Sequence, residues 1–210
     1  MIGLGVVLPH FGPSAQGPDA TERIRRLAAA ADELGYAALW TADHLIFPQR
    51  IRTPYPYGGT FPYPVDAPLF DPITTLTYVA GVTRRVKLGT SILVLPYRPP
   101  IPLAKQIATL DVLSGGRVLL GAASGWLREE FEMLGVPFAE RGARTDEAIR
   151  LMRALWTQDK ATFHGRWHRI DEAAFFPKPI QPGGPPIWVG GTSDAALRRV
   201  AHLGDGWIAV

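Results

Sequence analysis

Short apolar segments alternate with amphipathic segments along the whole chain. The apolar segments lack the polar–apolar alternation of half-exposed strands, a pattern typical of parallel strands covered on both faces. The six predicted strands are Ile2–Leu8, Ala37–Trp40, Val86–Leu95, Val118–Gly121, Ile187–Gly190 and Gly206–Val210. Between them, apolar residues recur at helical spacing, as at Ala148, Ile149, Met152 and Leu155.

Each amphipathic segment predicts one helix. The predicted helices are Thr21–Leu34, Asp71–Val82, Ile101–Leu113, Arg144–Trp156 and Asp194–Leu203. Gly35, Gly115 and Gly204 lie at or beyond the ends of three of them, and glycine commonly ends a helix. The alternation of strand and helix has no composition break. It predicts a single α/β domain over residues 1–210, with a parallel sheet that is either doubly wound or closed into a barrel.

Two segments interrupt this alternation. Residues Leu45–Leu69 are rich in Pro, Tyr and Gly and are too long for an ordinary connection between strand and helix. We expect them to form a functional loop over the site. Residues Thr162–Pro186 contain a glycine-centred turn and then a proline-rich stretch, which predicts a short hairpin followed by an extended lead into the next strand.

Charge is scattered along the chain. Among 210 residues, 22 Lys and Arg stand against 19 Asp and Glu, for a formal net charge of +3. The chain has no block of like charge that predicts a nucleic-acid or membrane surface. Cysteine is absent, which excludes disulfides, thiol catalysis and cysteine-bound metals. The apolar N-terminus has no basic leader and stops at Pro9, so we expect a strand rather than a signal peptide, and a cytoplasmic protein.

Polar residues follow the first two predicted strands, at the edge where parallel α/β proteins collect catalytic groups. His10 ends the first strand, and Asp43 and His44 follow the second. A histidine exchanges protons near neutral pH, and a neighbouring carboxylate can fix its tautomer. These residues are candidates for proton transfer or substrate binding. A turn capped by Asp43 beside a surface histidine explains the same dipeptide equally simply.

Small residues follow the next three strands, at Gly89–Ile92, Gly121–Gly125 and Gly190–Thr192. Such residues let a flat ring or a phosphate approach the backbone, although tight packing between strand and loop is the alternative. The last group precedes a helix, whose N–H groups and dipole attract anions. His164 and His168 are four residues apart but flank Gly165 in the predicted hairpin, so no metal site is predicted.

Several motifs, taken in order, resemble the luciferase-like monooxygenase superfamily, most closely its branch that depends on coenzyme F420. The motifs are Leu39–His44, Lys87–Pro96, Ala108–Arg117, Gly125–Phe131, Glu140–Glu147 and Pro186–Gly191. They span nearly the whole chain, and together they are more specific than any single motif. The resemblance implies an oxidoreductase with a TIM-type (β/α)8 barrel and a small organic substrate.

The resemblance also implies roles for residues at the strand ends. If this chain follows the family pattern, Asp43 and His44 contact the cofactor and substrate, and Thr90, Ser91 and Ile92 lie beneath the cofactor ring. It further implies a cis peptide between Ser91 and Ile92. The remaining expected contacts are Ser124 and Gly125 at the ring edge, Gly190, Gly191 and Thr192 at the cofactor phosphate, and His10 and Trp126 at the substrate.

Two positions depart from the family pattern. Trp126 stands where some F420 dehydrogenases have a glutamate that donates a proton, and Ala123 stands where many relatives have glycine. The branch resemblance favours F420 over FMN. A deazaflavin has carbon in place of the flavin N5, so it transfers hydride and activates dioxygen poorly, whereas FMN in the same site supports monooxygenation.

The six predicted strands are two fewer than a closed barrel needs. The chain also ends within the sixth strand. An open barrel leaves strand edges and apolar faces exposed, so we expect an incomplete barrel of marginal stability that forms a homodimer. A non-catalytic cofactor-binding protein or an inactive remnant is the alternative of another class, and the retained pair Asp43–His44 weighs against it.

Overall fold

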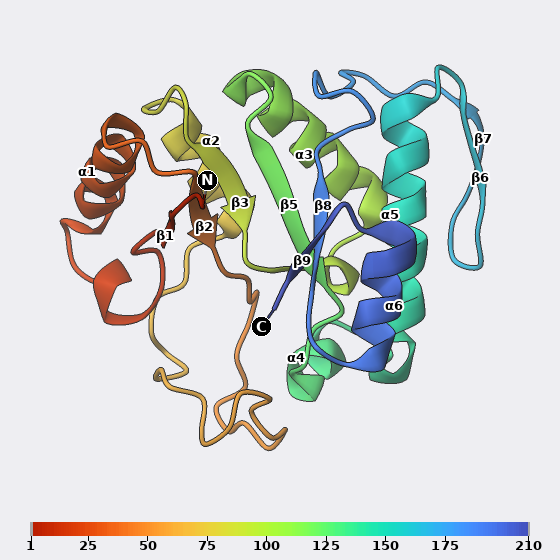
Figure 1. The fold of residues 1–210 in the computed structure, drawn as a ribbon. Helices are drawn as coiled ribbons and strands as arrows, with labels where there is room; N and C mark the ends of the chain where they lie inside the picture. Colours follow the sequence, from red (N-terminus) through yellow and green to blue (C-terminus); the bar gives the residue numbers. More distant parts are fainter. Residues whose placement is uncertain (1, 210) are drawn as a thin grey trace.

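A curled parallel sheet lies at the centre of the computed structural model, which describes residues 2–209 (Figure 1). It has six strands in one continuous order and a seventh, short strand beside β5. The order of the six across the sheet is β1, β2, β3, β5, β8 and β9. These strands are β1 Gly5–Val7, β2 Ala38–Thr41, β3 Lys87–Thr90, β5 Val118–Ala123, β8 Ile187–Gly190 and β9 Gly206–Ile208. Each pairs in parallel with the next, so their carboxyl ends gather at one end of the sheet.

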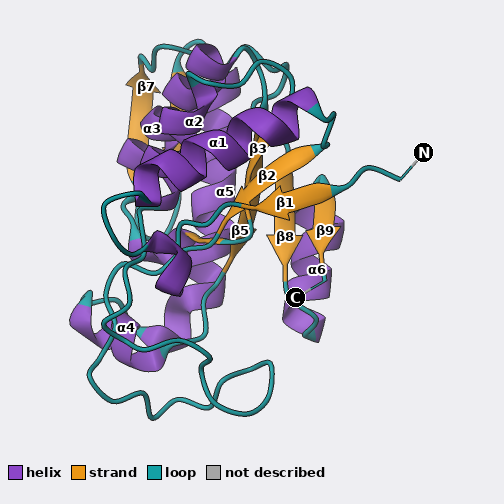
Figure 2. Cartoon of the chain, turned by 90° about the vertical axis from the view of Figure 1, so that its left-hand side faces the viewer, coloured by secondary structure: helices purple, strands orange, loops and turns teal. Residues whose placement is uncertain are grey.

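All the longer helices pack along the outer side of this sheet, and the short α4 lies at its carboxyl end near the long loop (Figures 1 and 2). They are α1 Ala20–Glu33, α2 Pro72–Ala80, α3 Pro100–Ser114, α4 Arg128–Met133, α5 Arg141–Thr157 and α6 Asp194–Leu203. Short 3-10 helices cover Gly12–Ala15, Leu95–Tyr97 and Phe138–Glu140. The predicted α/β class and the incomplete TIM-type barrel are confirmed. Helix α4 was not predicted, because one and a half turns carry too little periodicity to read from the sequence.

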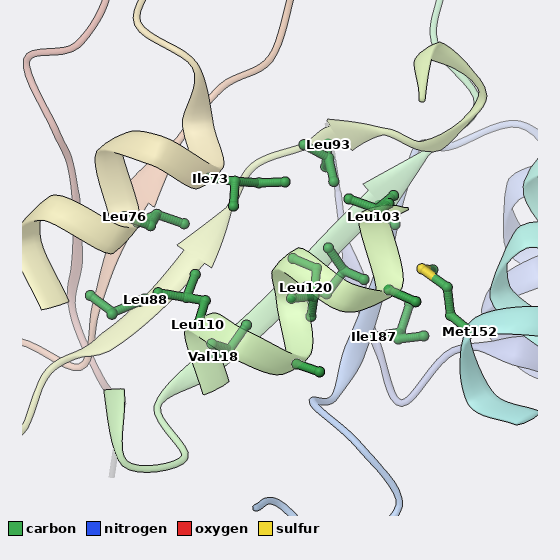
Figure 3. Packing of buried hydrophobic residues seen from close by; sticks show 14 of the residues in the cluster. Ile73, Leu76, Leu88, Leu93, Leu103, Leu110, Val118, Leu120, Met152 and Ile187 are labelled. Carbon is green, nitrogen blue, oxygen red and sulfur yellow. The ribbon is translucent and has the colours of Figure 1, made fainter. Parts of the chain in front are cut away.

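The main core lies between the sheet and the helices (Figure 3). Leu88 and Leu120 point from the strands toward α2 and α3, and both are fully buried. Met152 on α5 belongs to the same buried cluster. The alternation of side chains along each strand therefore assigns one face to this core and leaves the other face for the inside of the curl.

Tryptophans cover part of the inner face of the sheet. The rings of Trp40 on β2 and Trp188 on β8 lie 5.9 Å apart between centroids. A Cβ atom on Gly89 would stand only 2.3 Å from the Trp40 ring. Glycine at this position is therefore needed for Trp40 to lie across the neighbouring strand.

One predicted strand is divided in the structure. The run Val86–Leu95 was expected to form a single strand, but β3 ends at Thr90 and a separate strand β4, Leu93–Val94, pairs with β5. Between them, Ser91 and Ile92 are joined by the expected cis peptide. The break could not be predicted from the apolar run, because hydrophobicity alone does not indicate where the backbone leaves a strand. The last predicted strand is shorter than expected, and Val210 lies outside the described residues.

The two irregular segments lie in different parts of the molecule, one at the carboxyl end of the sheet and the other beside α5. Residues 45–68 form a long loop without helix or strand at the carboxyl end of the sheet, in the lower part of Figures 1 and 2. The second segment contains the antiparallel hairpin of β6 Ala161–His164 and β7 Arg169–Ala173, which lies beside α5. Asp111 on α3 then accepts hydrogen bonds from the backbone N–H groups of Ile180 and Gln181, and so fixes the lead into β8.

Candidate active site

Two cavities open at the carboxyl ends of the strands. The first, here called the aromatic chamber, measures about 700 Å³ and is lined by the ends of β1 and β2 and by the long loop. The second, here called the basic pocket, measures about 520 Å³ and lies at the ends of β5 and β8 beside the start of α6. Tyr57, Ile92, Gly125 and Trp126 line both cavities, so the two adjoin at these residues.

His44 lines the aromatic chamber and is held by a buried glutamate. Its Nδ1 lies 2.6 Å from Oε2 of Glu130, whose side chain is fully buried. The other carboxylate oxygen of Glu130 accepts from the backbone N–H groups of Leu45 and Ile46, at 2.6 and 3.2 Å. Because a carboxylate only accepts, Nδ1 of His44 must donate, which leaves Nε2 as the nitrogen that can meet a ligand.

Glu129, the neighbour of Glu130 on α4, fastens the next part of the loop. Its Oε1 accepts from the N–H groups of Arg52 and Thr53, and its Oε2 accepts from the Thr53 hydroxyl. Burial acts to raise the pKa of Glu129, but these hydrogen bonds outweigh burial and lower the pKa to about 2. The two adjacent carboxylates thus fix the first part of the loop to α4.

Asp43 is engaged with protein groups on both oxygens. The Arg98 guanidinium donates to Oδ2 and Oδ1 at 2.7 and 2.8 Å, and the backbone N–H of Val94 donates to Oδ2 at 2.9 Å. Burial raises the pKa of Asp43, and Arg98 opposes that rise. Arg98 also reaches Asp71 at the start of α2. The predicted pair Asp43–His44 therefore separates into two networks, and Asp43 positions the segment after the cis peptide.

His10 lines the same chamber with both ring nitrogens occupied. Nδ1 donates to the carbonyl of Leu8 at 2.8 Å, and Nε2 accepts from the N–H of Ala42 at 2.8 Å. Burial lowers the pKa of His10, so the ring is neutral at neutral pH. His10 consequently offers a ligand its ring surface rather than a free nitrogen.

Of the residues predicted to contact the cofactor in the turn after β3, only some line the cavities. Ser91 and Ile92 line the aromatic chamber, and Ile92 also lines the basic pocket. Thr90 lines neither cavity, because its side chain points into the sheet and its hydroxyl donates to the carbonyl of Gly121 at 2.7 Å. Trp126 stands at the junction of the cavities, with its ring edge-on to His44 at 5.9 Å.

The basic pocket gathers the predicted phosphate residues. Gly190, Gly191 and Thr192 line it at the start of the ten-residue helix α6, where the first N–H groups lack helical acceptors. Arg141 and Arg199 add two guanidinium groups to the lining. Neither arginine was singled out from the sequence, because only the packing of α5 against α6 brings them to this place.

One orphaned polar atom tests whether a cofactor fits the basic pocket. Ser124 lines this pocket, and its hydroxyl oxygen is buried and has no hydrogen-bond partner among the residues described. A buried hydroxyl is costly unless it is hydrogen-bonded, so a polar ligand group at this position would satisfy it. Gly191 has a φ of +114° and gives close access to the start of α6. The pocket therefore fits an anionic cofactor with a polar chain.

Glu130 is the main site residue that sequence reasoning missed. It stands within the motif Gly125–Phe131, but nothing in that motif indicates that its side chain reaches His44, 86 residues earlier. Arg98 was missed for the same reason. Within residues 2–209, no group of three or more His, Asp or Glu is arranged to hold a metal ion. In the same part of the chain, no helix is long and apolar enough to cross a bilayer.

Three comparisons with known proteins bear on this site. The family model described as luciferase-like monooxygenase matches residues 2–210. An uncharacterized protein of Mycobacterium tuberculosis is 39% identical over 184 residues, which cover 87% of this chain and 63% of that protein. This chain therefore spans less than two thirds of the length of that relative.

Relatives with named activities use two cofactors. The F420-dependent glucose-6-phosphate dehydrogenase of Amycolatopsis mediterranei is 33% identical over 99% of this chain and 56% of its own length. The FMNH2-dependent dimethylsulfone monooxygenase of Pseudomonas putida is 36% identical over 63% of this chain and 37% of its own.

A solved structure extends the match to three dimensions. The monooxygenase RslO1 from Streptomyces bottropensis superposes with a TM-score of 0.81 and 30% identity, covering 99% of this chain and 59% of its own. The parallel half-barrel agrees with this likeness. The chain thus belongs to the luciferase-like monooxygenase family of oxidoreductases.

Proposed function

We propose that this domain catalyses hydride transfer between coenzyme F420 and a small organic substrate, with His44 as the group that exchanges a proton with the substrate. The observation that carries the proposal is the pair His44–Glu130 at 2.6 Å, placed beside the junction of the two cavities. Glu130 orients the histidine, and the chamber brings a substrate to its free nitrogen.

The basic pocket is the proposed seat of the cofactor tail. Gly190, Gly191 and Thr192 would hold its phosphate at the start of α6, with Arg141 to balance the charge. Arg199 lines the same pocket but already pairs with Asp146. Ser91, Ile92 and Gly125 would hold the ring where the cavities meet. When bound, F420 supplies a hydride carrier that reacts poorly with dioxygen.

His44 has a defined part in either direction of the reaction. In alcohol oxidation, the substrate hydroxyl would lose its proton to Nε2 while its carbon gives up a hydride to oxidised F420. In ketone reduction, Nε2 of the protonated ring would return a proton to the substrate oxygen as the carbon gains a hydride from reduced F420. In both cases Nδ1 keeps its hydrogen on the side of Glu130. Asp43 takes a positioning role, since Arg98 and Val94 already bind its oxygens.

An FMN-dependent monooxygenase is the second candidate. The similarity to the FMNH2-dependent dimethylsulfone monooxygenase and to monooxygenase RslO1 supports it. Titration of the purified protein with F420 and with FMN, in both redox states, separates the two. We expect F420 to bind more tightly, and a clear preference for FMN would contradict the proposal and support monooxygenation.

A further inference from the structure

The linings of the two cavities differ in charge. The basic pocket carries Arg141 and Arg199, whereas no lysine or arginine among residues 2–209 lines the aromatic chamber. Of the carboxylates in that part of the chain, only Asp43 lines the chamber, and Arg98 already pairs with it. Apart from His44, whose ring is protonated before it donates in ketone reduction, an ionised substrate group would enter the chamber without a free partner of opposite charge, which is unfavourable in a partly dehydrated site.

Aromatic rings build one wall of the chamber. Phe11 lies 4.4 Å from Tyr63 and 6.1 Å from Phe61, measured between ring centroids. Phe61 in turn lies 6.1 Å from Trp126. Trp126 stands edge-on to His44. These ring contacts thus connect Phe11 through Phe61 and Trp126 to the proton-exchanging histidine.

The wall is fixed in place at both ends. Close to Phe11, the N–H of Gly12 donates to the carbonyl of Pro68, and the N–H of Phe70 donates to the carbonyl of His10. At the other end, Glu129 and Glu130 bind the start of the loop. A Cβ atom on Gly12 would stand 2.8 Å from the ring of Tyr63, so glycine there lets Tyr63 lie against Phe11. Because these rings are already held in place, a ligand that binds them does not have to order them. A flat aromatic ring can also stack on their faces, which adds to the contact that a saturated ligand makes.

We infer that the substrate is an uncharged molecule with a flat aromatic ring system, which lies against Phe11, Phe61 and Trp126 and directs a carbonyl or hydroxyl group at His44. This inference rests on the proposed function and adds the class of substrate to it. It sets this chain apart from its relative named as a glucose-6-phosphate dehydrogenase, whose named substrate carries a phosphate. Such a substrate would find no arginine or lysine among the described residues that line this chamber.

The test compares three matched ketones by calorimetry without cofactor. The probes are 2-acetylnaphthalene, its saturated decalin analogue, and 6-acetyl-2-naphthoate, which adds a carboxylate. We expect 2-acetylnaphthalene to bind at least about tenfold more tightly than either of the others, because only it stacks without burying a charge. Equal or tighter binding of the saturated or the charged ketone would overturn the inference.

Variants locate the bound ring. Phe61→Leu should weaken 2-acetylnaphthalene about tenfold and leave the decalin analogue unchanged, whereas Phe61→Tyr keeps a ring and should keep the preference. Tyr78→Leu, on the exposed side of α2, is the matched control and should change neither ketone. Equal weakening of both ketones by Phe61→Leu, in a protein that melts normally, would contradict stacking at this wall.

Turnover with reduced F420 is measured separately. If 2-acetylnaphthalene binds with the expected preference and is not reduced, the proposed hydride transfer fails while the ligand class stands. If only aliphatic or phosphorylated ketones are reduced, the ligand class fails while the proposed function stands.

Discussion

Two histidine–glutamate pairs in this molecule have the same hydrogen-bond pattern but lie in different surroundings. At the chamber, Glu130 accepts from Nδ1 of His44 and from two successive backbone N–H groups. In the hairpin region, Glu147 on α5 accepts from Nδ1 of His168, at 2.9 Å, and from the N–H groups of Arg166 and Trp167. In both pairs a buried carboxylate holds a turn and orients one imidazole ring.

Only the first pair adjoins a space that a ligand can enter. His44 lines the aromatic chamber, whereas neither His168 nor Glu147 lines either of the two cavities at the strand ends. The second pair instead joins α5 to the hairpin of β6 and β7. The comparison teaches that the pair itself does not define a catalytic function, because the groups that face the free nitrogen decide its role.

Replacement of the two histidines should give the largest difference between the regions. We expect His44→Ala to lower kcat about 100- to 10,000-fold, because it removes the proton-exchanging group, and to change cofactor affinity far less. Steady-state kinetics and F420 titration measure the two effects. His168→Ala is the matched control and should retain full turnover. Unchanged kcat in His44→Ala would place His44 in the same structural role as His168.

Acid should loosen the loop through Glu129. Its pKa of about 2 in the folded protein lies below its ordinary value of 4.5, so it stabilises the fold fully above pH 4.5. This stability is lost as the pH falls from 4.5 toward 2, and such a difference corresponds to about 3 kcal/mol. Tryptophan fluorescence during acid titration measures the change, since Trp126 borders the loop. Glu129→Gln should flatten the transition, and an identical acid profile in that variant would contradict the assignment.

Glu130→Gln should disturb the orientation of His44 without removing it. The glutamine amide donates where the carboxylate accepted, which favours the tautomer with the hydrogen on Nε2. We expect about a 100-fold loss of kcat and a displaced pH–rate profile. A loss confined to KM, with an unchanged pH profile, would show that Glu130 holds only the loop.

Glu147→Gln should have the smallest effect and should act on stability alone. Burial acts to raise the pKa of Glu147, but hydrogen bonds from His168 and the hairpin backbone outweigh burial and lower it. Their partial loss should cost about 1–3 kcal/mol of the free energy of unfolding, measured by urea denaturation. Turnover of the folded variant should match the parent protein. A fall in kcat as large as that of Glu130→Gln would remove the distinction between the two pairs.

Local pattern in the sequence determined the class of fold and the place of the site. Apolar strands alternating with amphipathic helices require a parallel sheet, and parallel strands bring their carboxyl ends together. His10, His44 and the segments Ser91–Ile92 and Gly190–Thr192 all follow such strands, so their gathering at one end followed from order alone. The motifs then supplied the family and the cis peptide between Ser91 and Ile92.

Only the tertiary structure decided which side chains meet. Glu130 reaches His44 across 86 positions, and Arg98 reaches Asp43 across 55. Such pairs depend on the path of the long loop and on the placement of α4, which no local periodicity encodes. Thr90 is a further example. The motif predicts that it lies beneath the cofactor ring, whereas in the structure its hydroxyl donates to the carbonyl of Gly121 within the sheet. Sequence periodicity reports which face of an element is buried, whereas hydrogen-bonded partners are selected by distances that exist only once the elements have packed.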